Sequence, residues 1–176
     1  MWCKHCEIET NEKECPICGQ KTETDVPTEI YWCEHCQVPI IRRVNQSGQS
    51  ECPICGQKTK YMASDLRPVF PEERLLLELF LKFEPLSLAE KSIWANKNRY
   101  YIDGHSKVIT AKNYEAADIE QVRKILQEHA QEKYSGAFKR HIQDFLTVNR
   151  HHLQAIIDEA HQFIREEASK YPAEKI

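Results

Sequence analysis

The sequence predicts an α+β protein, and three features of the chain carry this prediction. A cysteine motif occurs twice in the first third, an Asp-Gly pair separates two β-prone runs near the middle, and the last third repeats apolar residues at the helical period. We therefore expect two tandem cysteine-rich ribbons at 1–24 and 30–60, a small α+β unit with a hairpin at 61–112, and a C-terminal helical region at 113–171. The chain has 176 residues, enough for one ordinary domain beside the ribbons.

The cysteine motif has the spacing of a four-thiolate metal site. Each copy holds two Cys-x-x-Cys pairs, and a two-residue spacer lets both thiolates of a pair face one ion. The second copy has a longer fingertip, within 37–51. A glycine follows the second pair of each copy and permits a left-handed backbone there. We expect two zinc ions, one for each set of four cysteines: Cys3, Cys6, Cys15 and Cys18 in the first set, and Cys33, Cys36, Cys52 and Cys55 in the second.

Two other interpretations of the cysteines are disulfides and iron. Disulfide frameworks are typical of small secreted domains, and no apolar secretion signal follows Met1. A rubredoxin-like iron site shares the Cys-Pro-x-Cys-Gly pair, but Glu7 and Gln37 stand where its first pair is usually followed by glycine. Structural zinc is therefore favoured. Because four protein ligands close a zinc site, no open position for catalysis is expected.

The unit at 61–112 is predicted to combine a buried helix with a β-hairpin. Pro71 suits the first turn of a helix that is apolar on almost every side and that Pro85 ends. Ser87 and Glu90 have the spacing of a capping box for a short second helix. Asp103-Gly104 predicts a tight hairpin turn, because a type I′ turn needs positive φ at both central positions.

The region at 113–171 is predicted to be helical. An apolar stripe at 116–130 is followed by Ser135-Gly136, which we expect to interrupt the helix. A second stripe then runs from Phe138 to Ile164 as one long helix, or as two helices with a bend near Asn149-Arg150. Because this stripe is long, we expect it to present an apolar docking face.

Composition limits the partners and the chemistry. The net charge is −3, and Arg42 and Arg43 form the one basic cluster of the ribbons, so they are the candidate nucleic-acid contact against the alternative of a solvated loop. No catalytic or cofactor-binding residue is predicted, because the chain has no Gly-rich phosphate loop and its histidines fit surface positions. Without an apolar run long enough to span a membrane, and with reduced cysteines, the sequence predicts a cytoplasmic protein.

Three blocks outside the cysteines resemble a known family. They are Leu-Arg-Pro-Val-Phe-Pro-Glu-Glu-Arg at 66–74, Ser-Ile-Trp-Ala-Asn-Lys-Asn-Arg-Tyr-Tyr-Ile-Asp-Gly at 92–104 and Tyr-Pro-Ala-Glu-Lys-Ile at 171–176. With the ribbons before them, they resemble the N-terminal region of a bacterial branch of the phosphoadenosine phosphosulfate reductase family, within the PP-loop nucleotide-binding superfamily. The resemblance covers nearly the whole chain.

The resemblance also implies a missing partner. In that family a segment similar to 171–176 leads into the first strand of an α/β domain, and that strand runs into a Ser-Gly-Gly-Lys-Asp-Ser phosphate loop. Residues 172–176 are therefore expected to begin a linker or strand toward a PP-loop domain that this sequence does not contain. We expect either a truncated chain or a short natural chain whose catalytic half is separate.

Two functions from different classes follow. The first is a zinc-binding accessory region of a PP-loop enzyme, not catalytic by itself, which positions a substrate or partner and meets the PP-loop domain in cis or in trans. The second is a free-standing zinc-ribbon adapter that binds nucleic acid or protein. Self-association through the apolar face at 138–164 would favour the first function, and a self-contained core that covers this face would favour the second. Electron transfer by a rubredoxin-like centre is a third, weaker interpretation that the identity of the metal decides.

Overall fold

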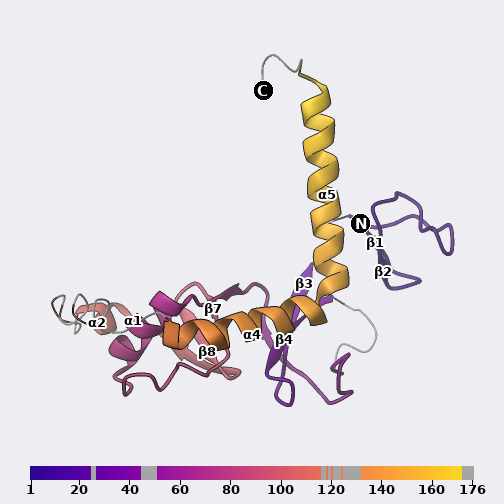
Figure 1. Cartoon of the computed structure of the whole chain (residues 1–176). Coiled ribbons are helices and arrows are strands. Elements are labelled where there is room, and N and C mark those ends of the chain that lie inside the picture. The colour runs from indigo at the N-terminus through magenta and orange to yellow at the C-terminus, as the bar shows by residue number, and fades with distance from the viewer. Residues whose placement is uncertain are drawn as a thin grey trace.

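The computed structural model describes residues 1–24, 27–44, 51–115, 118, 120, 124 and 132–171. It is a mixed α+β structure of helices and small antiparallel sheets, which confirms the predicted fold class. The three-stranded and the four-stranded sheet lie next to each other (Figure 1). Helix α4 (Glu132–Val148) runs across them, and helix α5 (Arg150–Ser169) projects away from them (Figure 1). Within the described residues, every helix is too short or too polar to cross a membrane.

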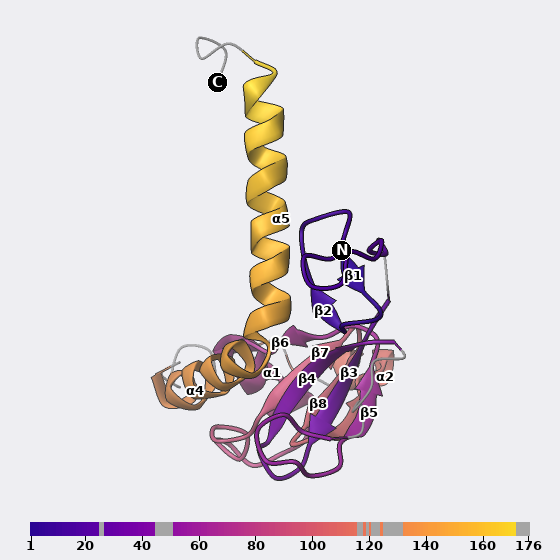
Figure 2. The same ribbon diagram turned by 90° about the vertical axis from the view of Figure 1, so that its right-hand side faces the viewer.

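Ribbon 1, which comprises residues 1–24, contains little regular structure. Strands β1 (Trp2–Cys3) and β2 (Ile8–Glu9) pair antiparallel, and isolated bridges join Trp2 to Glu23 and Glu14 to Lys21. Ribbon 1 lies beside the N-terminal half of α5 (Figure 2), where the N-terminal ammonium of Met1 is 2.8 Å from a carboxylate oxygen of Glu159.

Ribbon 2 is defined here by residues 28–44 and 51–63. Its sheet has the order β4-β3-β5, with β3 at Thr28–Cys33, β4 at Val38–Arg43 and β5 at Lys60–Ala63. Val38 and Ile40 are buried against the second set of cysteines, and Phe145 and Val148 of α4 pack on this cluster. The buried, apolar N-terminal half of β4 therefore gives ribbon 2 a core that it shares with α4.

The middle unit contains a four-stranded antiparallel sheet in the order β6-β7-β8-β9. Its strands are β6 (Arg67–Pro68), β7 (Ile93–Asn96), β8 (Arg99–Ile102) and β9 (His105–Val108). The predicted hairpin is confirmed, because Asp103 (φ 47°) and Gly104 (φ 80°) form the turn between β8 and β9. Gly104 also lies against ribbon 2: a Cβ atom at this position would be 2.3 Å from Nε1 of Trp32.

Helix α1 (Pro71–Leu81) begins at Pro71 as predicted and ends one residue before Lys82, which adopts a left-handed conformation. It packs on one face of the four-stranded sheet, where Val69, Leu77, Leu88, Ile93, Ala95, Tyr100 and Ile109 form the core. The predicted short helix after Pro85 is wrong. Successive turns occupy 85–90 instead. The Glu78 carboxylate accepts hydrogen bonds from the amides of Leu86 and Leu88, which in a helix would need an N-terminal capping residue.

The helical region is confirmed in part. Helix α2 (Ala111–Glu115) is short, and most of the stripe predicted at 116–130 lies outside the described residues. The predicted interruption at Ser135-Gly136 is wrong, because α4 continues through both residues. Tyr134 and Ala137 on either side are almost fully buried, and this packing offsets the low helix propensity of glycine.

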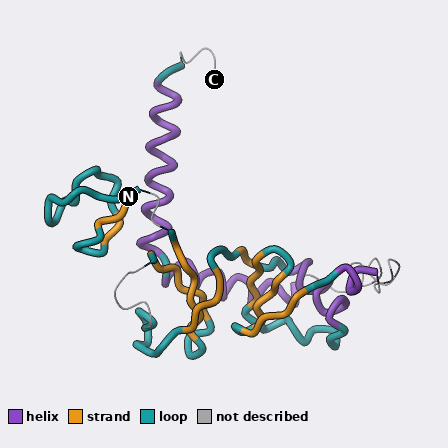
Figure 3. Tube along the Cα trace, turned by 180° about the vertical axis from the view of Figure 1, so that it is seen from behind, coloured by secondary structure: helices purple, strands orange, loops and turns teal. Residues whose placement is uncertain are grey.

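The predicted bend near Asn149-Arg150 is confirmed (Figure 3). The side chain of Asn149 fixes it. Asn149 lies between α4 and α5 and is 4% exposed. Its Oδ1 atom accepts the amide hydrogen of Ile41 at 2.7 Å, and its Nδ2 atom donates to the carbonyl oxygens of Pro39 and Phe145. Asn149 therefore occupies the open edge of β4 and ties the bend to ribbon 2.

The two helices differ in how much of the apolar stripe they bury. On α4, the Phe145 ring lies 4.8 Å from the Trp94 ring and the Phe138 ring lies 5.4 Å from the Phe70 ring, measured between centroids. On α5, the large apolar side chains Ile156, Ile157, Phe163 and Ile164 are between 47% and 62% exposed. The α4 half of the stripe therefore belongs to the core of the protein, and the α5 half is open.

Candidate metal centres

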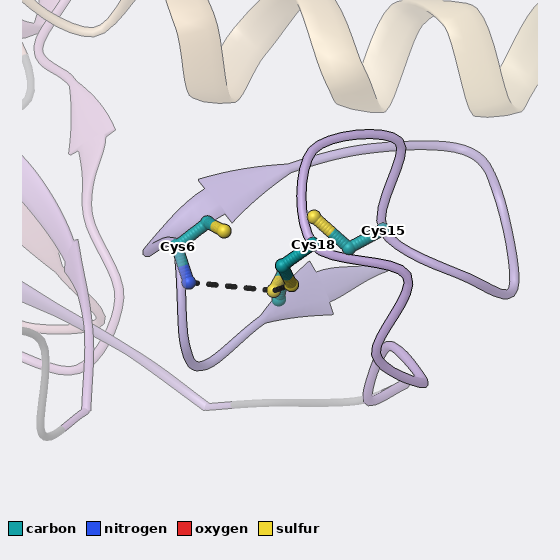
Figure 4. Close-up of side chains that lie close together, drawn as sticks. Cys6, Cys15 and Cys18 are labelled. Carbon is teal, nitrogen blue, oxygen red and sulfur yellow. Dashed lines mark hydrogen bonds between the residues drawn. The ribbon is translucent and has the colours of Figure 1, made fainter.

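Each ribbon gathers its four cysteines into one cluster. In both clusters the four Sγ atoms lie within 4.8 Å of one another, and the first and third cysteines are buried while the second and fourth are partly exposed. Cys6, Cys15 and Cys18 point toward a common centre from two separate loops of ribbon 1 (Figure 4). In the part of the chain that the structure describes, these two clusters are the groups that could hold a metal ion.

The distances between the sulfur atoms fit a tetrahedral ion. Sγ of Cys3 lies 3.6 Å from Sγ of Cys18, and Sγ of Cys33 lies 3.6 Å from Sγ of Cys55. Four sulfurs at the usual zinc–sulfur distance form a tetrahedron with edges of about 3.8 Å. A disulfide would need about 2 Å, and all eight cysteines are free thiols. The geometry therefore matches metal ligands and excludes disulfides within the clusters.

The backbone around both cysteine pairs has the left-handed turns that aim amides at sulfur. Gly19 and Gly56 have φ of 70°, as expected from the sequence, and Glu7 and Gln37 adopt φ of 51° and 55° after the first pairs. The amide of Cys6 donates to Sγ of Cys3 at 3.4 Å. The two ribbons therefore use the same local turn, with glycine only at its second occurrence in each.

The pKa values of two thiols of ribbon 1 are shifted in opposite directions by hydrogen bonds and burial. A hydrogen bond with Cys18, together with burial, raises the pKa of Cys6 to about 12. Burial also acts to raise the pKa of Cys15, but amide hydrogen bonds from Cys18 and Ile17, with smaller contributions from neighbouring thiols, outweigh it and lower the value to about 7. A bound dication would favour the ionised form of all four cysteines, because it stabilises their thiolates together.

Ribbon 2 shows the same pattern. Burial raises the pKa values of Cys33 and Cys36, and the amide of Gln57 lowers that of Cys55. Because a metal ion must displace the protons from thiols with raised pKa values, metal affinity falls as the pH falls. A centre with four sulfur ligands is closed and suited to a structural role, and each cluster offers four sulfurs.

The two arginines predicted as a nucleic-acid contact both have partners within the protein. Arg42 is half-buried, which lowers its pKa, and its guanidinium donates to the carbonyl oxygen of Glu51 at 3.1 Å. Arg43 donates to Oε1 of Glu9 in ribbon 1 at 2.9 Å. The fingertip residues 45–50 beside them lie outside the described residues. Contact with nucleic acid stays a prediction.

The described histidines of the C-terminal helical region divide into two groups. His151 and His161 are exposed, as expected for surface residues, and His129 lies outside the described residues. His141 and His152 are partly buried. Nδ1 of His152 lies 2.5 Å from Oε1 of Glu9, so this histidine joins α5 to ribbon 1.

A buried polar network in the middle unit was not predicted from the sequence. Glu78 is 3% exposed, and its carboxylate accepts hydrogen bonds from the amides of Leu86 and Leu88 and from the Tyr134 hydroxyl. Arg74 is 1% exposed and donates to the carbonyl oxygens of Val69 and Lys91. Burial lowers the pKa of Arg74 to about 10. The network connects α1 to α4 and to the turns at 85–90.

Comparison with known proteins adds no assignment to this geometry. No family model, no curated protein and no solved structure matches the chain. The class that the fold and the clusters define is a mixed α+β protein with two four-cysteine ribbons, each able to hold a metal ion.

Proposed function

We propose that this chain is a zinc-binding accessory region of a PP-loop nucleotide-dependent enzyme similar to the phosphoadenosine phosphosulfate reductases. In this role it binds two structural zinc ions, carries out no catalysis by itself and positions a substrate or partner near a PP-loop domain in cis or in trans. The observation that carries the proposal is the pair of closed four-sulfur clusters joined to an exposed helix.

Zinc is the ion that the clusters fit best. Four cysteine thiolates at tetrahedral distances are typical of structural zinc, and small cysteine-rich units of this kind usually depend on their metal to fold. Glu7 and Gln37, where a rubredoxin usually has glycine, favour zinc over iron. Bound zinc would cross-link the two cysteine pairs of each ribbon and thereby fix its loops.

The two central sequence blocks that carry the resemblance contact each other. The guanidinium of Arg67 forms two hydrogen bonds of 2.6 Å with the Glu73 carboxylate, which also accepts the Tyr100 hydroxyl at 2.8 Å. Lys91 pairs with Asp103, whose carboxylate accepts the amide of Ser92. These contacts support a scaffolding role for both blocks.

The exposed half of the apolar stripe supports docking to another domain. Ile156, Ile157, Phe163 and Ile164 repeat along α5 at helical spacing, and exposed apolar surfaces of this kind mark interaction sites. The same surface would also support self-association of the isolated chain.

Two measurements test the accessory role. The gene sequence after the codon for Ile176, and the genes beside it, should encode a PP-loop domain; its absence from both would argue against the proposal. Calorimetry with ATP and with phosphoadenosine phosphosulfate should detect no binding to this chain, and micromolar binding of either would overturn the division of roles.

Sedimentation at several concentrations tests the exposed helix. We expect concentration-dependent association that Phe163→Ser weakens. Phe83→Ser, which changes a less exposed aromatic residue after α1, is the matched control and should leave association unchanged. A strictly monomeric chain would contradict self-association.

A free-standing adapter that binds nucleic acid is the second candidate, and one surface favours it. Tyr61 is 58% exposed, and its ring lies edge-on to Tyr31 with centroids 5.9 Å apart, next to Lys60. Exposed tyrosines can stack with unpaired bases. Under this candidate a single-stranded oligonucleotide binds at low salt and Tyr61→Ala weakens binding; no binding at low salt removes the nucleic-acid form of the adapter.

A further inference from the structure

A cavity of about 860 Å³ lies where ribbon 1, β4 and the start of α5 meet. Its walls include Glu9 and Asn11 from ribbon 1, Ile41 and Arg42 from β4, and His152 from α5. This volume is within the range of sites for small ligands. The cavity is separate from both cysteine clusters, since no cysteine lines it.

Three polar atoms of the cavity walls lack a hydrogen-bond partner among the described residues. They are Oε2 of Glu9, Oδ1 of Asn11 and Nε of Arg42, and all three are buried. The Glu9 side chain is only 10% exposed, and its other oxygen, Oε1, contacts Arg43 and His152. Buried polar atoms are nearly always satisfied by protein, water or a ligand, so these three are candidate positions for hydrogen bonds to a bound molecule. A ligand that satisfies all three offers donors to two acceptors and an acceptor to one donor.

The charges of the walls indicate the sign of the ligand. Four carboxylates line the cavity, from Glu7, Glu9, Glu12 and Asp158, against two guanidiniums, from Arg42 and Arg43. A buried carboxylate oxygen binds a charged donor more strongly than a neutral one. The excess of acidic groups therefore favours a cationic ligand over a phosphate or a nucleotide.

We propose that this cavity binds a basic side chain of a polypeptide, with arginine as the best fit. A guanidinium presents several N–H donors in one plane, so it supplies hydrogen bonds to Glu9 Oε2 and Asn11 Oδ1. The carbonyl oxygen of the same residue accepts from Arg42 Nε. The apolar walls, which include Ile8, Ile40 and Val148, contact the methylene stem. The inference does not depend on the PP-loop proposal, because it uses only the folded ribbons and α5.

Calorimetric titration of the zinc-loaded chain with N-acetyl-arginine amide tests this site. We expect saturable binding with a dissociation constant on the order of 1 mM or below, as usual for a ligand of this size. Asn11→Leu removes one orphan acceptor and should weaken binding about tenfold or more. Glu34→Gln changes an exposed carboxylate outside the cavity and should leave binding unchanged.

A shorter ligand distinguishes the residue that contacts the guanidinium from the residue that contacts the carbonyl group. N-propylguanidine has the guanidinium but no carbonyl group, so Arg42→Lys should weaken binding of the amide and leave that of N-propylguanidine unchanged. Asn11→Leu should weaken both. If Asn11→Leu does not fold, as judged by circular dichroism, Asn11→Asp serves instead and must tighten binding of both ligands.

Several results would overturn the proposal. They are the absence of saturable binding, equal or tighter binding of N-acetyl-glutamate amide or of adenosine monophosphate, and arginine-amide binding that the Asn11 variants do not change. None of these results tests the metal centres or the accessory role. Zinc content tests the metal centres, and the neighbouring genes test the accessory role.

Discussion

Buried polar side chains hold the middle unit together, and one of their contacts joins residues that are distant in sequence. Glu78 and Tyr134 are 56 residues apart, yet the Tyr134 hydroxyl donates to Oε2 of Glu78 at 2.8 Å. A buried carboxylate is stable only when hydrogen bonds replace its lost water, and three donors do so here. These residues therefore determine how α1 and α4 fit together.

Glu78→Ala should be strongly destabilising. The substitution leaves the amides of Leu86 and Leu88 and the Tyr134 hydroxyl without their acceptor, which costs about 3 kcal/mol or more. Tyr134→Phe removes one donor and should cost about 1–2 kcal/mol. Urea unfolding of the zinc-loaded chain measures both, with Glu84→Ala as the exposed control. Equal effects for Glu78→Ala and Glu84→Ala would show that the network contributes nothing.

His141 should make the stability of the protein sensitive to mild acid. Burial, with the nearby positive charges of Arg74 and Arg140, lowers its pKa in the folded protein. Below the ordinary histidine pKa of about 6.5, the unfolded chain takes up a proton that the folded chain resists, so stability falls as the pH falls. Between pH 7.5 and 5.5, the zinc-loaded wild type should therefore lose more stability than His141→Gln. Equal losses in denaturant unfolding would refute this role.

Residue types with strongly local chemistry could be predicted, and residues that depend on distant contacts could not. The eight cysteines were identified because a two-residue spacer determines which thiolates can share an ion. Arg74 and Glu78 lie within an apolar helix pattern, and nothing in their neighbours along the chain indicates that both are buried. The left-handed conformations of Glu7 and Gln37 follow from the repeat: each occupies the position after a Cys-x-x-Cys pair that glycine fills in the second pairs.

The secondary-structure elements were predictable where one residue type determines the backbone. Pro71 begins α1, Asp103-Gly104 forms the hairpin turn, and the bend falls at Asn149. The expected break at Ser135-Gly136 was wrong because tertiary packing of Tyr134 outweighs local propensity. The expected helix after Pro85 was wrong because Glu78 provides the hydrogen bonds that stabilise turns there.

Substitution by alanine should have opposite effects on the stability of the protein at Gly136 and at Gly104. Gly136 lies exposed inside α4, and a Cβ atom there would have no neighbour within 4 Å, so Gly136→Ala should stabilise the protein by about 0.5–1 kcal/mol. Gly104 has φ of 80° and lies against Trp32, so Gly104→Ala should be destabilising by at least about 1 kcal/mol. Thermal unfolding of both variants checks this pair. Destabilisation by Gly136→Ala would mean that α4 is not helical at that position.

Contacts between segments far apart in the chain hold the two ribbons and the C-terminal helices together. Ribbon 1 is held to α5 by Glu9 and His152 and by the Met1 ammonium with Glu159, and Asn149 holds the helix bend to ribbon 2. These contacts leave one side of α5 open and enclose the cavity at the junction. They could not be predicted, because each joins segments that are more than 100 residues apart.

Each ribbon should depend on its own metal ion. Cys15→Ser removes one ligand of the first cluster, so ribbon 1 should lose its ion and its fold while ribbon 2 keeps both. Backbone NMR of the zinc-loaded variant distinguishes the two ribbons. Loss of order in both would contradict their independence.

Elemental analysis of the purified chain, combined with its visible absorption spectrum, tests the two-zinc account most directly. The two clusters predict about two zinc ions for each chain, no absorption band in the visible range, and about one zinc ion for Cys15→Ser. One metal ion for each wild-type chain, or iron with a visible thiolate absorption band, would contradict the account.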